Sequence, residues 1–184
     1  MNNLEIEYLT PNQYKKYEIE LLTIFNENFF KNGGMLYSDD FLINSDSIVI
    51  AKMNQSVVAY MAITANIEKE LDREHEIYTE EPEIKDSLVI KHLVVKQEYR
   101  GLNIATQLIE NLKEYSKQNK IKNLYLWTTP DNKVALKFYE KMGFYKMGDY
   151  RPANGTFQGL NNFHSIMMCR LVNHMSHFFE KYIL

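Results

Sequence analysis

Apolar and polar residues alternate along LEIEYLT, residues 4–10, near the start of the chain. Alternation with a period of two is typical of a half-buried β-strand. Thr10 and Pro11 then open a helix, because proline suits the first helical position. From residue 14 to residue 30, apolar residues recur at spacings of three and four, which predicts one or two helices. The segment KNGG, with its two glycines, would stop the last of them.

Three strongly apolar runs follow. SIVIAKM and SVVAYMAITA are separated only by Asn54 and Gln55, which predicts a hairpin in which asparagine tolerates a positive φ. LVIKHLVV, residues 88–95, is nearly all apolar and predicts a central strand covered on both faces. Residues 66–87 between them are acidic, contain a proline and show weak periodicity. They predict a loop, with room for strand ends on either side.

The next segment predicts an amphipathic helix, followed by a buried strand in IKNLYLWTT, residues 121–129. Strand, helix and strand in this order imply parallel strands joined by a right-handed crossover. One face of the helix would be apolar, formed by Ile104, Leu108, Ile109, Leu112 and Tyr115.

A shorter helix is predicted in residues 131–144, with Asp131 or Asn132 as its N-cap and Gly143 at its end. Residues 144–150 and 163–172 predict two last strands. Together the elements describe an α/β protein with a mixed sheet, antiparallel early and parallel in the middle.

Composition narrows the class of protein. The 184 residues are 45% hydrophobic and 24% charged, as in ordinary globular chains, and their number fits a single domain. A net charge of −3, without a basic run, argues against a nucleic-acid partner. The single cysteine, Cys169, forms no internal disulfide and no multi-cysteine zinc site. With no apolar leader and no run that could cross a bilayer, we expect a soluble cytoplasmic protein without a membrane partner.

The turn before the amphipathic helix has features that suit an anion. A helix N-terminus offers unpaired N–H groups and the positive end of the macrodipole. Gly101 permits a close approach to the backbone, and Asn103 is among the few residue types at ease with positive φ. Ala105 keeps the first turn slim, while Arg100 adds a guanidinium and Thr106 a hydroxyl. Such a turn can also be only a tight connection, so its neighbours matter.

With its YRG lead-in, this turn resembles that of the GCN5-related N-acetyltransferase (GNAT) superfamily. There the pyrophosphate of acetyl-CoA sits on a Q/R-x-x-G-x-G/A turn between the fourth strand and the third helix. The match is at Arg100 and Ala105, and the departure is at Asn103, where glycine is usual. The resemblance implies a GNAT-like acyl-CoA N-acyltransferase fold and a set of residues that bind acetyl-CoA: Arg100, Gly101, Leu102, Asn103, Ile104, Ala105 and Thr106.

A second motif of the superfamily, N-x-x-A-x-x-(F/L)-Y-x-x-x-G-F, is matched downstream by NKVALKFYEKMGF, residues 132–144. The resemblance implies that Asn132 hydrogen-bonds the pantetheine arm, although an N-cap role is the plain alternative. It also implies that Tyr139 protonates the leaving thiolate, whereas otherwise Tyr139 would be a core aromatic. In similar proteins the fourth strand bulges, so that amides near Leu93, Val94 and Val95 pair with pantetheine and polarise the acetyl carbonyl.

Acetyl transfer to an amine also needs a base. An amine with a pKa of about 10.4 is neutral only to about one part in 10³ at pH 7. His92 is the candidate base or water relay, because the ordinary pKa of histidine is nearest to neutral pH. The alternative is a packed histidine, with Glu83 or Asp86 acting through water.

We therefore expect an acetyl-CoA-dependent N-acetyltransferase that acts by direct attack of a primary amine of a small molecule or peptide. Cys169 lies outside both motifs, which argues against a covalent acetyl-enzyme. Two alternatives stay open, a non-catalytic acyl-CoA-binding module and an enzyme that uses another acyl-CoA. The acids of residues 66–87 would attract a basic acceptor, or they are simply solvated.

The GNAT domain is assigned to residues 1–172, and residues 173–184 are expected to form a C-terminal helical tail. His174 and His177 have a spacing that could bind a metal, but no third ligand accompanies them, so no metal site is expected. An apolar helical stripe in residues 173–184 would pack on the domain or support a homodimer.

Overall fold

The computed structural model describes residues 4–29, 45–67, 76–78, 81–150, 156–157, 160–161 and 165–172. The chain forms two compact units. The first comprises Met1–Ala65 and Val89–Leu112, and the second comprises Asn66–Leu88 and Lys113–Leu184. The assignment of one domain to residues 1–172 stays a prediction.

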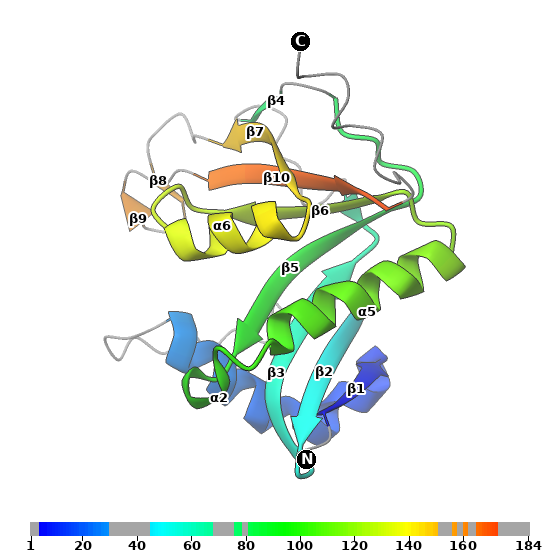
Figure 1. Ribbon diagram of the computed structural model, residues 1–184, viewed down its shortest axis with the longest axis vertical. Coiled ribbons are helices and arrows are strands. Elements are labelled where there is room, and N and C mark those ends of the chain that lie inside the picture. Colours follow the sequence, from blue (N-terminus) through cyan, green and yellow to red (C-terminus); the bar gives the residue numbers. More distant parts are fainter. Residues whose placement is uncertain are drawn as a thin grey trace. The chain divides into compact units, whose positions relative to one another are not determined.

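Four strands of the first unit lie side by side in the order β1 (Leu4–Leu9), β2 (Ser47–Met53), β3 (Ser56–Thr64) and β5 (Ser87–Val95) (Figure 1). Each neighbouring pair is antiparallel. The connection between β2 and β3 is the hairpin expected from the sequence, because Asn54 and Gln55 have φ values of +50° and +67°. Such values match the twist of two-residue hairpin turns.

The predicted N-terminal helix is present as three consecutive pieces: α1 (Pro11–Tyr14), a 3₁₀ turn η1 (Lys15–Tyr17) and α2 (Glu18–Phe29). Thr10 stands at the N-cap with Pro11 at the first position, as the sequence predicts. The Thr10 amide donates to Gln13 Oε1 at 2.9 Å, which satisfies a donor that the helix start would otherwise leave open. The KNGG stop lies outside the described residues.

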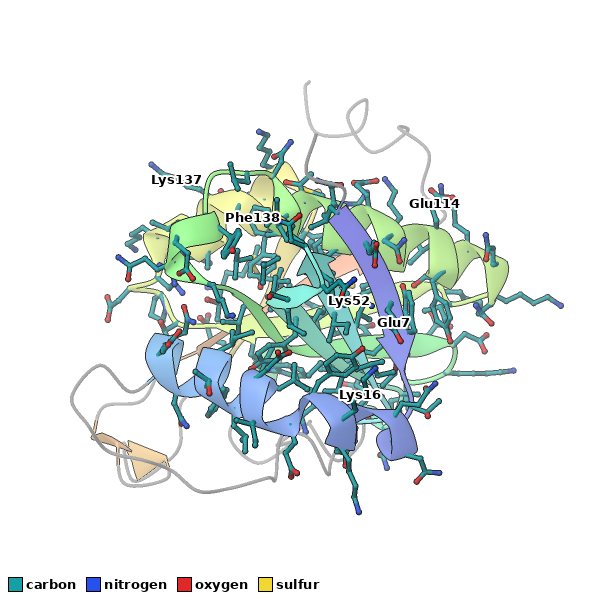
Figure 2. The ribbon with its side chains drawn as sticks, turned by 90° about the horizontal axis from the view of Figure 1, so that it is seen from below. Glu7, Lys16, Lys52, Glu114, Lys137 and Phe138 are labelled. Atoms are coloured by element: carbon teal, nitrogen blue, oxygen red, sulfur yellow. The ribbon has the colours of Figure 1, made fainter. Side chains whose placement is uncertain are left out.

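Helices cover both faces of these strands. Figures 1 and 2 show α2 and α5 (Ile104–Gln118) on opposite sides of the sheet. Apolar side chains of α1 and α2 pack with alternate residues of the strands into one buried cluster: Leu9, Tyr14, Leu21, Ile24, Ile48, Ile50, Val57, Tyr60, Ala62 and Val94. This two-sided burial explains why β2 and β3 are apolar almost throughout.

Polar side chains mark the outer edge of the sheet, at β1 and β2. Lys52 Nζ lies 2.7 Å from Glu7 Oε2 and 3.8 Å from Glu5 Oε2. Figure 2 labels Glu7 and Lys52 on these adjacent strands. The hydrogen bond that Lys52 donates to Glu7 raises the pKa of Lys52, so the lysine keeps its charge.

In the second unit the strand order is β6 (Asn123–Thr128), β10 (Ser165–Leu171), β7 (Tyr145–Tyr150) and β4 (Glu76–Tyr78). Their pairs are antiparallel, and β8 (Thr156–Phe157) pairs with β9 (Leu160–Asn161). The helix α6 (Lys133–Lys141) precedes β7. Its last turn closes at Gly143, which has a φ of +84° and donates to the Glu140 carbonyl at 2.9 Å.

The sequence places most of these elements within a few residues of their observed bounds. It misses β4, which lies inside the predicted acidic loop, and the short pair β8 and β9. The parallel pairing expected between residues 88–95 and 121–129 stays a prediction, because the two strands belong largely to different units. Among the described residues, no helix has the length and apolar character needed to cross a membrane.

Candidate active site

The strand β5 leads into a short connection that is held by several backbone hydrogen bonds. Lys96 N–H donates to the Val58 carbonyl at 2.9 Å, which extends the pairing with β3 by one residue. The 3₁₀ turn η2 (Gln97–Tyr99) follows, and there the amides of Tyr99 and Arg100 bond back to the carbonyls of Lys96 and Gln97. The amides of Lys96, Tyr99 and Arg100 are therefore paired within the fold.

After Arg100 comes a run of amides that lack backbone acceptors among the described residues. The next backbone bond is from Gln107 N–H to the Asn103 carbonyl at 3.1 Å, in the first turn of α5. None of the six amides of residues 101–106 donates to an acceptor among the described residues. An α-helix leaves its first amides without intrahelical partners, and the turn adds further ones. The corner before α5 thus presents a row of donors.

Two residues give the turn its shape. Gly101 has a φ of +80° and Asn103 a φ of +65°, both in the left-handed region. An ideal Cβ on Gly101 would meet no atom within 4 Å, so packing does not exclude a side chain and the backbone conformation is what favours glycine. The open space beside Gly101 leaves room for a ligand. Ile104 is buried and fixes the start of α5, whereas Leu102 is 53% exposed.

The guanidinium of Arg100 has partners inside the first unit. Its Nε donates to the Val95 carbonyl at 3.3 Å, and one Nη donates to Asn28 Oδ1 in the last turn of α2. The sequence indicates Arg100 as an anion-binding residue but gives no sign of its partner Asn28. The two positions are far apart in the chain, and no local motif joins them. Ala105 and Thr106 lie half-buried in the first turn of α5.

A bulge interrupts the pairing of β3 with β5. Ala62 is opposite His92, and Ile63 is opposite Ile90, so Lys91 is the extra residue. A bulge in this strand is what the resemblance implied. Leu93, Val94 and Val95 follow it in regular register with β3, and Val94 is buried in the core.

His92 packs against Phe25 of α2, with ring centroids 5.2 Å apart. Burial, with a smaller contribution from Lys91, lowers the pKa of His92 to about 4. The choice of His92 as a base rested on the ordinary pKa of histidine. A buried imidazole with this pKa is neutral at pH 7 and holds a proton weakly, so it suits a relay better than a base.

Tyr139 and Asn132 belong to the second unit, at the two ends of α6. Asn132 is the N-cap, since its Oδ1 accepts from the Ala135 amide at 3.1 Å. Tyr139 is buried between Phe138 and Phe144, with centroid distances of 5.2 and 5.6 Å. Burial raises the pKa of Tyr139 far above its usual range. The phenol is therefore protonated at every physiological pH.

The two carboxylates considered as alternative bases are engaged with a lysine. Lys122 Nζ lies 3.3 Å from Glu83 Oε1 and 3.2 Å from Asp86 Oδ2. Asn123 also donates to Glu83 Oε2 at 3.3 Å. The Glu83 amide donates to the Tyr125 hydroxyl at 3.0 Å. These contacts tie the segment before β5 to β6, which is a structural role.

The cysteine and the two C-terminal histidines were the remaining candidates for a nucleophile or metal ligands. Cys169 lies buried on β10 and forms no disulfide. His174 and His177 lie outside the described residues, as does the C-terminal stripe. Within the described part of the chain, no group of three or more metal-ligating side chains is present. The turn residues lie in the first unit, and Asn132 and Tyr139 in the second.

Comparisons with known proteins agree with the motifs. A curated relative, an uncharacterised N-acetyltransferase of Methanocaldococcus jannaschii, is 29% identical over 101 residues, which cover 55% of this chain and 40% of the relative. N-alpha-acetyltransferase 30 of Schizosaccharomyces pombe is 38% identical over 55 residues, which cover 30% of this chain and 37% of that protein. The chain thus spans less than half the length of these relatives.

A solved structure shares the fold. Arabidopsis thaliana Naa50, in complex with the bisubstrate analogue CoA-Ac-MVNAL, superposes with a TM-score of 0.65 at 17% identity, covering 91% of this chain and 97% of that one. The profile of the acetyltransferase (GNAT) family matches residues 10–144, more than half of the sequence. The chain therefore belongs to the acetyltransferase (GNAT) family and has its mixed α/β fold.

Proposed function

We propose that this protein is an acetyl-CoA-dependent N-acetyltransferase that acts on a primary amine of a small molecule or peptide by direct attack. The observation that carries the proposal is the row of amides at residues 101–106, which have no acceptor among the described residues. A helix N-terminus favours an anion, because its first amides have no intrahelical acceptor and lie at the positive end of the macrodipole. A diphosphate supplies several anionic oxygens to such a corner.

The residues present fit the group that the family uses. Gly101 and Asn103 both have left-handed backbone conformations, and the open space beside Gly101 leaves room for a phosphate oxygen. The remaining contacts proposed for acetyl-CoA are the backbone of Leu93, Val94 and Val95 and the side chain of Asn132. Asn132 Oδ1 already caps α6, so its amide NH₂ is the group left for pantetheine.

Acetyl-CoA supplies the electrophilic thioester, and the chain supplies the proton transfers. Tyr139 is the proposed acid, since its raised pKa keeps the proton on the phenol until a thiolate departs. His92 is proposed as a relay that passes the proton of the amine to water. Its neutral state at pH 7 allows one ring nitrogen to accept while the other donates.

The names of two similar proteins favour a peptide amine among the possible acceptors. One is an N-alpha-acetyltransferase, and the other is described with a bisubstrate analogue that joins CoA to the peptide MVNAL. The first acceptors to assay are therefore short peptides with a free α-amine. Polyamines and aminoglycosides are further basic acceptors.

The test combines binding with turnover. Calorimetric titration of CoA into the wild type and into Gly101→Ala should show a loss of affinity of about tenfold or more, because alanine strains a φ of +80° and places a methyl group in the open corner. Asn54→Ala is the matched control, since it also puts alanine at positive φ, but in the hairpin. CoA release is then followed against the panel of amines.

Each outcome is informative. Weakened CoA binding in Gly101→Ala alone, with turnover on at least one amine, supports the proposal. Equal affinity in the wild type and both variants would remove the turn from the cofactor site. Tight CoA binding without turnover on any amine would favour a non-catalytic acyl-CoA-binding module instead.

A further inference from the structure

Arg100 is held by two neutral acceptors. One is the Val95 carbonyl at the end of β5, and the other is Asn28 Oδ1 in the last turn of α2. No carboxylate among the described residues lies within ion-pair distance of its guanidinium. The side chain is therefore oriented while its positive charge remains uncompensated.

The guanidinium of Arg100 has more N–H donors than its two observed bonds use, so it can also bind an anion. Arginine has five N–H groups, and the two observed bonds occupy one on Nε and one on Nη. The other three N–H groups have no acceptor among the described residues, and Arg100 directly precedes the row of amides at 101–106. Bonds from a guanidinium to phosphate are roughly twice as strong as neutral ones.

Asn28 is itself fixed in one orientation. Its Nδ2 donates to the Ile24 carbonyl at 2.7 Å, within α2. That bond directs the amide nitrogen to the helix and leaves the oxygen for Arg100. An aspartate would have nearly the same shape, but it would repel the Ile24 carbonyl and neutralise the guanidinium.

We propose that Asn28 is a positioning residue for the diphosphate of acetyl-CoA, because it orients the Arg100 guanidinium toward the anion without cancelling its charge. The inference rests on the proposed function and deepens it. Asn28 acts through Arg100 and does not touch the ligand.

The decisive variant is Asn28→Asp, which keeps an acceptor for Arg100 and adds one negative charge. We expect the Kd for CoA to rise about tenfold, and the dependence of Kd on ionic strength to become weaker, since one cation no longer faces the anion. Asn28→Ala should raise the Kd about threefold, because Arg100 keeps its charge but loses one of its two anchors.

Asn119→Asp is the matched control. Asn119 Nδ2 donates to the Tyr115 carbonyl at 2.8 Å, four residues earlier, as Asn28 does with Ile24. The control thus loses the same kind of bond at a helix end and adds the same charge. Its Kd for CoA should stay within about twofold of the wild type.

Dephospho-CoA, which keeps the diphosphate but lacks the 3′-phosphate, separates the two anionic groups of the ligand. An equal loss with CoA and dephospho-CoA in Asn28→Asp supports the inference. A loss confined to CoA would overturn it, as would unchanged Kd and salt dependence with only a lower melting temperature. Wild-type protein that binds no CoA would instead defeat the proposed function.

Discussion

Gly101 and Asn103, two residues apart in the turn before α5, both adopt the left-handed backbone conformation, with φ of +80° and +65°. Glycine reaches this region because it has no Cβ, and asparagine is the commonest of the few other residues that do. Asparagine can therefore stand at the position where the family motif has glycine and still adopt a left-handed conformation. We therefore expect the amides after position 103 to face the ligand whether that residue is asparagine or glycine.

The first prediction concerns this substitution. Asn103→Gly should leave the Kd for CoA within about threefold of the wild type, because the backbone conformation is unchanged. Asn103→Val should weaken binding by about tenfold or more, since a β-branched residue at positive φ costs about 1–2 kcal/mol. Calorimetric titration measures both.

A control for strain is available at Lys120, whose φ is +59°. Lys120→Val should lower the melting temperature and leave CoA binding intact. An increase in affinity of tenfold or more in Asn103→Gly would mean that the asparagine side chain obstructs the site.

The second prediction concerns Tyr139. Tyr139→Phe should lower kcat by about 10²-fold or more, the range of general acid catalysis, while the KM for acetyl-CoA changes by less than about threefold. The ring contacts with Phe138 and Phe144 do not involve the hydroxyl, so the fold should persist. Steady-state kinetics on an active amine give the result.

Tyr145→Phe is the control, because Tyr145 is 39% exposed on β7 and carries no proposed role. Since the pKa of Tyr139 lies far above its usual range, the wild-type rate should show no fall from this residue below pH 10. An unchanged kcat in Tyr139→Phe would assign the residue to the core alone.

The third prediction concerns stability in acid. Burial lowers the pKa of His92 to about 4 in the folded chain, whereas an exposed histidine has a pKa of 6.5, so the unfolded chain binds more protons between these values. The free energy of unfolding should therefore fall as pH drops from 6.5 to 4, by up to about 3 kcal/mol, and be flat with respect to His92 above 6.5. Urea unfolding across this range tests it.

The pH dependence of the free energy of unfolding is compared with that of His92→Leu, whose side chain at this position cannot bind a proton. Carboxylates titrate equally in both proteins, so the difference between the two curves isolates His92. Parallel curves from pH 7 to pH 4 would show that the imidazole is not buried in solution.

The fourth prediction concerns Cys169. Direct attack requires no acetyl-enzyme, and the thiol is buried on β10, so Cys169→Ala should retain kcat within about twofold. Initial rates at varied acetyl-CoA and amine should give intersecting rather than parallel lines. Parallel lines that disappear in Cys169→Ala would establish a covalent route.

Local patterns predict much of the fold and part of the site. Residues 47–53 and 56–64 are predicted as strands because both are rich in residues that favour β-strands, and Asn54 marks the turn between them. Asn132 reads as an N-cap because a short polar side chain precedes an amphipathic stretch, and its bond to Ala135 confirms it. These features depend on neighbours in the chain, which a sequence displays directly.

The sequence by itself determined most of the elements, the turn at Gly101 and the residues that carry the family motifs, because backbone propensity and periodicity act over a few residues. Only the tertiary structure decided that Arg100 meets Asn28, that Lys91 forms the bulge, and that burial moves the pKa values of His92 and Tyr139 in opposite directions away from neutral pH. Desolvation and long-range contacts depend on what the folded chain packs around a group, and no local pattern encodes that.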